Sequence, residues 1–165
     1  RKDFGEHRYW WNSFFSVFLL QGILMWLISA PLLGAQFYPE NNLGILDYMG
    51  IATWIIGFVF EAGGDLQLAR FKSDPANKGK VLETGFWRYT RHPNYFGDAA
   101  VWLGYGLICL AAGSYLPFLG TVLMTALIIK VSGVALLEKT LKESKPEYRE
   151  YIRKTSAFIP WFTKK

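Results

Sequence analysis

The stretch FFSVFLLQGILMWLISAPLL (14–33) holds twenty residues without a charged side chain. An α-helix needs about 20 predominantly apolar residues to cross the hydrocarbon core of a bilayer. No Lys or Arg occurs in 9–60 or in 96–129, so all eighteen basic residues of the chain fall into three clusters. This segregation of charge is typical of a membrane protein and has no evident purpose in a soluble helical bundle.

Three more apolar stretches lie at 45–62, 96–112 and 115–137, and each is close to the length of a span. The composition agrees, with 52% apolar, 18% aromatic and only 19% charged residues. The predicted fold class is therefore all-α: an integral membrane helical bundle of about four transmembrane helices. We expect one membrane domain over 1–165, with a cytoplasmic loop at 64–95 and an amphipathic cytoplasmic tail at 138–165.

The connections at 34–44 and 113–114 carry no positive charge, so all three basic clusters are predicted to lie on one side. The positive-inside tendency makes that side cytoplasmic, with both termini there, although it leaves open which membrane is meant. We attribute the net charge of +5 to this topology and to anionic head groups, and expect no nucleic-acid partner. The lone Cys109 forms no intrachain disulfide, and no metal-ligand spacing occurs. Residue 1 is Arg, so we expect the chain to be trimmed, processed or part of a longer protein.

The motif TRHPNYFGD (90–98) lies where the polar loop meets the third predicted span. Pro93 suits the first turn of a helix, and Asn94 could satisfy exposed backbone donors there. Capping does not require the other polar residues of the motif. We therefore predict a polar ligand pocket at the cytoplasmic end of the bundle, formed by Arg91, His92, Asn94, Tyr95 and Asp98.

Two further segments allow two interpretations each. Glu61 and Asp65 share a helix face, where they could pair with Arg70 or Lys72 in the interface, or could line a polar cavity. The tail could be an interfacial helix held by its aromatic residues Phe158, Trp161 and Phe162. Alternatively it could be a lid that reaches an anionic cofactor with the side chains of Tyr148, Tyr151, Arg153 and Lys154.

The run GFWRYTRHPNYFGDAAVWLGY (85–105) resembles the C-terminal signature of the steroid 5-alpha-reductase family, in particular its poorly characterised membrane branch. The upstream GDLQLARFKSDPANKGK (64–80) and the closing YREYIRKTSAFIPW (148–161) extend the resemblance over about 61–161. This resemblance implies a helical membrane bundle whose C-terminal half binds NADPH from the cytoplasmic side. It also implies reduction of a carbon–carbon double bond in a lipid-soluble substrate.

The resemblance further implies roles for single residues. Asp65 and Lys72 match positions that contact the nucleotide, with Lys72 in place of a more usual arginine. Tyr89 and Asn94 would lie along the cofactor, and Asp98 stands where steroid reductases carry a glutamate near the nicotinamide. In that family the residues that engage the substrate carbonyl come from N-terminal helices, which have no counterpart before Arg1, so we expect a cofactor half-site here.

The run Arg91-His92-Pro93 also resembles membrane methyltransferases that modify isoprenylcysteine carboxyl groups or phospholipids, where it belongs to the S-adenosylmethionine site. The leading interpretation is nevertheless an NADPH-dependent reductase of a sterol-like or other isoprenoid lipid, because phosphates need cations whereas a sulfonium favours aromatic and acidic neighbours. A methyltransferase is the first alternative. A non-catalytic lipid-binding or assembly subunit of a larger membrane complex is the second.

Overall fold

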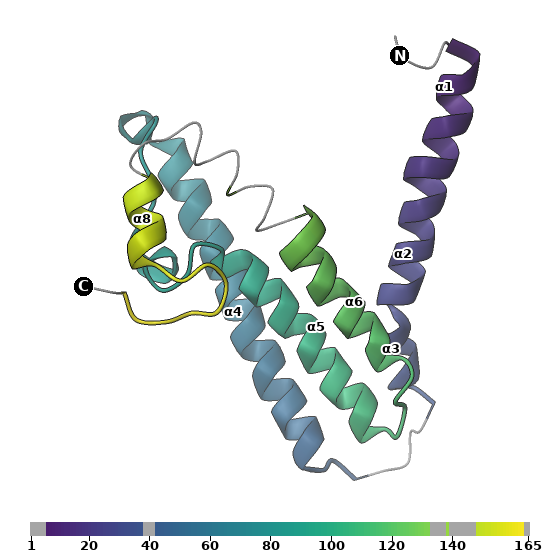
Figure 1. The fold of residues 1–165 in the computed structure, drawn as a ribbon. Helices are drawn as coiled ribbons and strands as arrows, with labels where there is room; N and C mark the ends of the chain where they lie inside the picture. The colour runs from purple at the N-terminus through teal and green to yellow at the C-terminus, as the bar shows by residue number, and fades with distance from the viewer. Residues whose placement is uncertain (1–5, 38–41, 133–137, 139–147, 164–165) are drawn as a thin grey trace.

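The computed structural model describes residues 6–37, 42–132, 138 and 148–163 (Figure 1). Every regular element in this part of the chain is helical, and no strand occurs in it. A single isolated parallel bridge joins Thr90 to Ser156. The predicted all-α class is thus confirmed.

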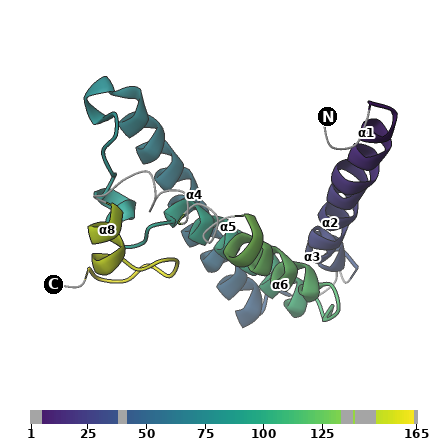
Figure 2. The same cartoon turned by 45° about the horizontal axis from the view of Figure 1, so that its top comes forward.

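The N-terminal part of the chain forms one nearly continuous helical rod. It consists of α1 (Glu6–Ser13), the π-helical segment η1 (Phe14–Leu19), α2 (Leu20–Ile28) and α3 (Ala30–Gly34). This rod stands apart from the other helices and meets them near α3, as both views show (Figures 1 and 2). We call α1, η1 and α2 the arm.

Three helices lie side by side beyond the arm: α4 (Ile45–Ser73), α5 (Pro93–Ala111) and α6 (Phe118–Leu127), the last continued by η4 (Ile128–Ser132). The α4–α5 contact is the most extensive one between helices. The end of α4, the start of α5 and the end of α6 lie toward one end of the array, as do the start of α1 and the short helix α8 (Tyr148–Lys154) (Figure 1). Described residues from all three basic clusters lie on these elements: Arg8 in α1, Arg70 and Lys72 at the end of α4, and Lys130 in η4.

Within the described residues, two helical segments are long and apolar enough to cross a membrane: Trp10–Gly34, of 25 residues, and Ile45–Ser73, of 29 residues. Only 11% of the most apolar window of each is buried within the protein, which leaves most of its side chains for a lipid environment. The third and fourth spans remain predictions. α5 has 19 residues, Phe118–Lys130 is a shorter apolar helix, and 133–137 lies outside the described residues.

The helix predicted to end its span near residue 62 continues to Ser73. The apolar pattern stops where polar residues begin, but Leu, Gln, Ala and Arg are good helix formers and carry α4 onward. It ends at Asp74, whose side chain accepts a hydrogen bond of 2.9 Å from the Ala76 N–H, just before Pro75 opens the 3-10 turn η2 (Pro75–Asn77). The first ten residues of the predicted loop at 64–95 therefore belong to a helix that projects beyond the apolar array.

Glycines allow α4 and α5 to approach each other closely. A Cβ placed on Gly57 would lie 2.6 Å from Val101 N and 2.7 Å from Gly97 O. Gly50 and Gly104 face each other in the same way, since a Cβ on Gly104 would lie 2.8 Å from Gly50 O. Small residues of this kind permit tight helix packing in membranes. This contact fixes where the start of α5, and with it the motif at 90–98, stands against α4.

Candidate functional site

The chain between α4 and α5 folds back onto α4. The Gln67 side chain accepts a hydrogen bond of 3.0 Å from the Phe86 N–H, and the Trp87 indole donates one of 3.0 Å to Gly64 O. Gly85 has a φ of +61°, which a side chain would make unfavourable. These contacts hold the 3-10 turn η3 (Gly85–Arg88) against α4 and so position Thr90, which lies just before α5.

The C-terminal segment closes over this point from the other side. The Arg91 N–H donates to Ser156 O at 2.9 Å, and the Trp161 N–H donates to Tyr89 O at 2.9 Å. The Thr90 hydroxyl, which is fully buried, donates to Phe158 O at 2.9 Å. Segments more than sixty residues apart in the chain are thus joined through their backbones.

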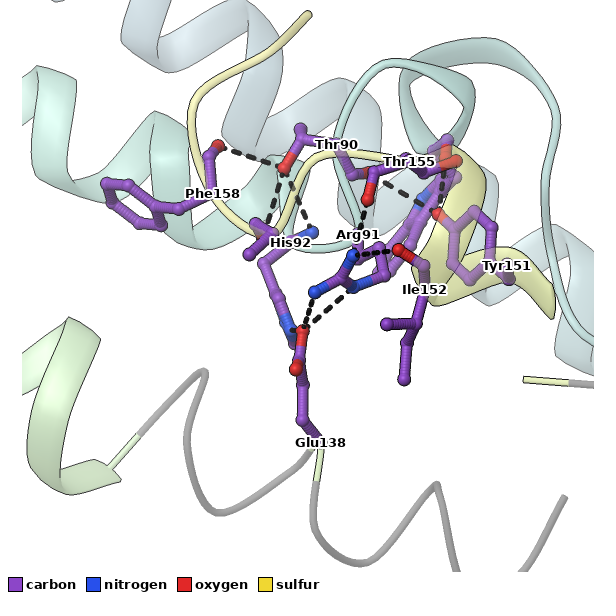
Figure 3. Close-up of polar contacts among 10 residues, drawn as sticks. Thr90, Arg91, His92, Glu138, Tyr151, Ile152, Thr155 and Phe158 are labelled. Carbon is purple, nitrogen blue, oxygen red and sulfur yellow. Dashed lines mark hydrogen bonds and ion pairs between the residues drawn. The ribbon is translucent and has the colours of Figure 1, made fainter. Parts of the chain in front are cut away.

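The Arg91 guanidinium is buried and donates four hydrogen bonds within the protein (Figure 3). Its Nε and one terminal nitrogen donate to Glu138 Oε1 at 2.8 and 2.6 Å. The other terminal nitrogen donates to Ile152 O at 3.0 Å and to Thr155 O. Four of its five N–H groups are therefore engaged. Arg91 fastens the C-terminal segment to the start of α5.

His92 and Tyr148 complete this buried cluster, and each keeps an unpaired polar atom. Neither His92 Nε2 nor the Tyr148 hydroxyl has a hydrogen-bond partner, although His92 Nε2 approaches Glu138 Oε1 at 3.5 Å. Burial lowers the pKa of His92, and Arg91 lowers it further, while Glu138 opposes both. Burial, reinforced by Glu138, raises the pKa of Tyr148 to about 12. At neutral pH, therefore, burial favours a neutral imidazole and a protonated phenol.

Tyr151, from the same face of α8 as Tyr148, is also buried, and its hydroxyl donates to Trp87 O. Burial is the main cause that raises the pKa of this phenol. We call this set of side chains the Arg91 junction: Thr90, Arg91, His92, Glu138, Tyr148, Tyr151 and Thr155.

A cavity of about 650 Å³ lies against the Arg91 junction. This volume falls within the range of about 300–1,000 Å³ that is usual for cofactor and ligand pockets. Its lining includes seven of the predicted site residues: Lys72, Arg91, His92, Asn94, Tyr95, Tyr148 and Tyr151. The structure thus brings together residues from α4, α5 and α8.

Four predicted site residues do not line the cavity. Asp65 is connected to the cavity wall through Asn94, whose side-chain amide donates a hydrogen bond of 2.9 Å to the Asp65 carboxylate. Asp98 is half-buried one turn after Asn94, close enough to Glu61 to interact with it electrostatically. Tyr89 is 41% exposed and stacks edge-on against Phe162.

Arg153 is exposed on the outer face of α8, and neighbouring Lys154 pairs with Glu150. The helix turns its tyrosines toward the cavity and its basic residues away from it. The aromatic end of the tail differs again, since Trp161 and Phe162 are largely exposed. Both interpretations of the tail, an interfacial helix and a lid over a cofactor, remain predictions.

One expectation about Asn94 was wrong. Pro93 does open α5, but the Asn94 side chain caps no backbone donor there and bonds to Asp65 instead. The acid at residue 65 offers a charged acceptor, which forms a stronger hydrogen bond than a neutral one. This contact joins the end of α4 to the start of α5 beside the cavity.

The cavity is also lined by three residues that the sequence analysis did not single out: Lys78, Lys80 and Trp87. Glu138, whose side chain is 13% exposed, was missed as well, because nothing in the sequence around it distinguishes it from the other acids of the tail. Lys78 and Lys80 belong to the second of the three basic clusters of the sequence. That they line the same cavity as Lys72 follows only from the folded structure. Within the described residues, no group of His, Cys, Asp and Glu side chains could hold a metal ion.

Comparisons with known proteins place this chain in a family. The chain matches, over residues 1–155, the family described as "Protein of unknown function (DUF1295)". An uncharacterized protein of Schizosaccharomyces pombe is 25% identical over 167 residues, which cover 89% of this chain and 48% of that protein. No solved structure matches the chain.

Two further relatives carry the name Delta(14)-sterol reductase. The protein of Mus musculus is 30% identical over 131 residues, and that of Methylotuvimicrobium alcaliphilum is 30% identical over 134 residues. In both comparisons the alignment covers 70% of this chain and 31% of the relative. The chain thus spans about half or less of the length of these curated relatives.

The family match covers 155 of the 165 residues and agrees with the resemblance carried by the motif at 90–98. The chain belongs to the DUF1295 family, which is part of the steroid 5-alpha-reductase superfamily.

Proposed function

We propose that this chain is the cofactor-binding part of a membrane-embedded NADPH-dependent reductase, which reduces a carbon–carbon double bond in a sterol-like or other isoprenoid lipid. The observation that carries the proposal is the cavity beside the Arg91 junction, where Lys72, Lys78 and Lys80 meet apolar and aromatic walls. A dinucleotide carries both anionic phosphates and planar rings, and this lining suits both. The relatives named Delta(14)-sterol reductase support the substrate class.

The residues present fit a dinucleotide. Cations gather on one segment of the wall, whereas Leu68, Phe71 and Trp87 supply apolar surface. The buried Tyr148 hydroxyl has no hydrogen-bond partner at the cavity wall, and a ligand could supply one there. In this proposal Lys72 and Lys78 bind phosphate, whereas Arg91 donates its hydrogen bonds to Glu138 and the C-terminal segment.

When bound, NADPH supplies the hydride that is added to one carbon of the double bond, and it leaves as NADP⁺. The protein must orient the nicotinamide, exclude water and deliver a proton to the other carbon, or polarise a conjugated carbonyl. Asp98 is proposed for the acid role because it follows Asn94 by one turn of α5 and stands near a second carboxyl group, Glu61. Asn94, held by Asp65, would orient the cofactor.

The test is a titration of the purified protein in lipid nanodiscs with NADPH, followed by nicotinamide fluorescence. Lys72→Gln and Lys78→Gln should each weaken binding by about tenfold or more, because a hydrogen bond to a charged group contributes about 1.5–3 kcal/mol. Lys154→Gln is the matched control, since Lys154 pairs with Glu150 and does not line the cavity. Binding of S-adenosylmethionine without binding of NADPH would contradict the proposal and favour methyl transfer.

A measurement of catalytic turnover distinguishes the proposed acid, Asp98, from the residues proposed to bind NADPH. Asp98→Asn should retain NADPH binding and lose reduction of unsaturated sterols, measured by mass spectrometry as the gain of two hydrogens. Reduction at an undiminished rate in this variant would remove Asp98 from the chemistry.

A further inference from the structure

Glu138 uses one carboxylate oxygen to contact two neighbouring residues of the motif. Its Oε1 accepts hydrogen bonds from Arg91 Nε at 2.8 Å and Nη2 at 2.6 Å, and lies 3.5 Å from His92 Nε2 (Figure 3). The three side chains are 13%, 7% and 4% exposed, respectively. Little water reaches these contacts, so their electrostatic interactions are screened much less than those of a surface pair.

No neutral residue could perform the same task. The guanidinium group of arginine is a cation, and a buried cation requires a counter-charge. The backbone oxygens of Ile152 and Thr155 accept two of its hydrogen bonds but supply no net charge. Glu138 therefore fixes both the charge balance and the direction of the guanidinium.

The same carboxylate also constrains His92. Its imidazole stacks on the Tyr95 ring with centroids 5.6 Å apart and planes 5° apart, which fixes the plane of the ring. The Nε2 edge faces Glu138, whose oxygen is the acceptor that this nitrogen approaches. Stacking and charge together define one orientation for a side chain that lines the cavity.

We propose that Glu138 is a positioning residue, which holds the Arg91 guanidinium and the His92 imidazole in the orientation in which they line the cavity. Glu138 follows η4 in the chain and contacts the start of α5 through Arg91 and His92. The effect of Glu138 on cofactor binding rests on the function proposed above. Its effect on Arg91 and His92 does not.

The pKa of His92 depends on its contact with Glu138, so this pKa can be measured to test the proposal. The charged and titratable groups around the imidazole are Glu138 and Arg91, the stacked phenol of Tyr95, and Tyr148 of α8 beside the same ion pair. Burial and Arg91 lower the pKa of His92, and Glu138 raises it. Removal of the carboxylate charge should therefore lower the pKa of His92 further.

The chain contains only two histidines, His7 and His92, so the imidazole NMR signals are easily assigned with a His7→Gln variant. Glu138→Gln should move the pKa of His92 downward by about one unit, since an opposite charge at this range typically shifts a pKa by about 1–3 units. Glu138→Asp keeps the charge and should give a smaller shift. Glu150→Gln, at an exposed acid paired with Lys154, should leave His92 unchanged.

An unchanged His92 titration in Glu138→Gln, or the same shift in Glu150→Gln, would overturn the inference. If Glu138→Gln fails to fold, the Asp variant decides: a His92 titration identical to wild type together with unaltered imidazole shifts would overturn it. NADPH titration of the same proteins gives the second readout. We expect about tenfold weaker binding in Glu138→Gln and partial recovery in Glu138→Asp.

The two readouts separate this inference from the proposed function. A His92 shift without any NADPH binding by the wild-type protein contradicts the proposed cofactor but supports the role of Glu138. NADPH binding with no His92 shift contradicts the role of Glu138 and leaves the cofactor in place.

Discussion

The arm and the Arg91 junction bury opposite kinds of side chain. η1 and α2 contain no buried residue, and Trp26 of the arm is 68% exposed. In the junction, the polar residues Thr90, Arg91 and His92 are all at least 94% buried. Apolar side chains thus face outward in the first region, and polar side chains face inward in the second.

This difference shows which environment each region depends on. An isolated apolar helix satisfies its own backbone hydrogen bonds and gains by contact with lipid, so the arm needs few protein contacts. Buried polar groups need partners of matching charge and geometry, and these must come from the protein itself. Changes in the junction should therefore be far more costly than equal changes in the arm.

The largest effect should follow from breaking the buried ion pair. Glu138→Leu leaves the Arg91 charge uncompensated and should lower the free energy of unfolding by about 3–5 kcal/mol. The double variant Arg91→Met/Glu138→Leu should recover much of that loss, since no unpaired charge remains. Reversible denaturation in mixed micelles measures both. A Glu138→Leu protein as stable as a Glu150→Leu control would contradict the burial of this pair.

A smaller effect is expected where α4 and α5 meet. Gly57→Ala would press a methyl group against the backbone of α5 and should cost about 1–3 kcal/mol through overpacking. Gly22→Ala in the arm is the matched control, because a Cβ there meets nothing within 4 Å. That change should be neutral or stabilising by up to about 1 kcal/mol, since alanine favours a helix over glycine. Equal losses of stability in Gly57→Ala and Gly22→Ala would contradict the difference in packing between the arm and the α4–α5 contact.

The smallest expected effect on stability is the difference between removing the hydroxyl of Tyr151 and removing that of Tyr148, the two buried tyrosines of α8. Tyr151→Phe removes the hydrogen bond to Trp87 O and should cost about 1 kcal/mol. Tyr148→Phe removes a hydroxyl without a partner and should be neutral or slightly stabilising in the absence of ligand. Thermal unfolding of the two variants compares them directly. If NADPH stabilises the wild type more than Tyr148→Phe, the unpaired hydroxyl serves the ligand.

Much of the helical framework was predictable because it depends on local sequence. Runs of apolar residues gave the positions of α2, α4, α5 and α6, and Pro93 gave the start of α5. The polar end of α4 was not predicted, since the hydrophobic pattern marks where a membrane would end and not where a helix ends. Hydrogen bonds within the helix continue regardless of that boundary until Asp74 and Pro75 stop it.

The candidate site was predictable only in part. The motif at 90–98 contributed Arg91, His92, Asn94 and Tyr95 to the cavity wall, because these residues are close in sequence and lie at or just before the start of α5. Asp98 follows on that helix but lies beyond the lining, and Arg153 faces away on α8. Which side of a short helix faces a cavity depends on what the helix packs against.

The sequence by itself determined the apolar helices, the clustering of positive charge and the motif that carries the family resemblance. Each of these follows from residue type and from spacing of at most a few turns. Only the tertiary structure decided that Arg91 pairs with Glu138, 47 residues away, and that Lys78 and Lys80 join Lys72 at one cavity. Many acids and cations along the chain could have formed such contacts. Burial selects among them, because a charge removed from water is stable only beside the particular partner that the packed helices bring to it.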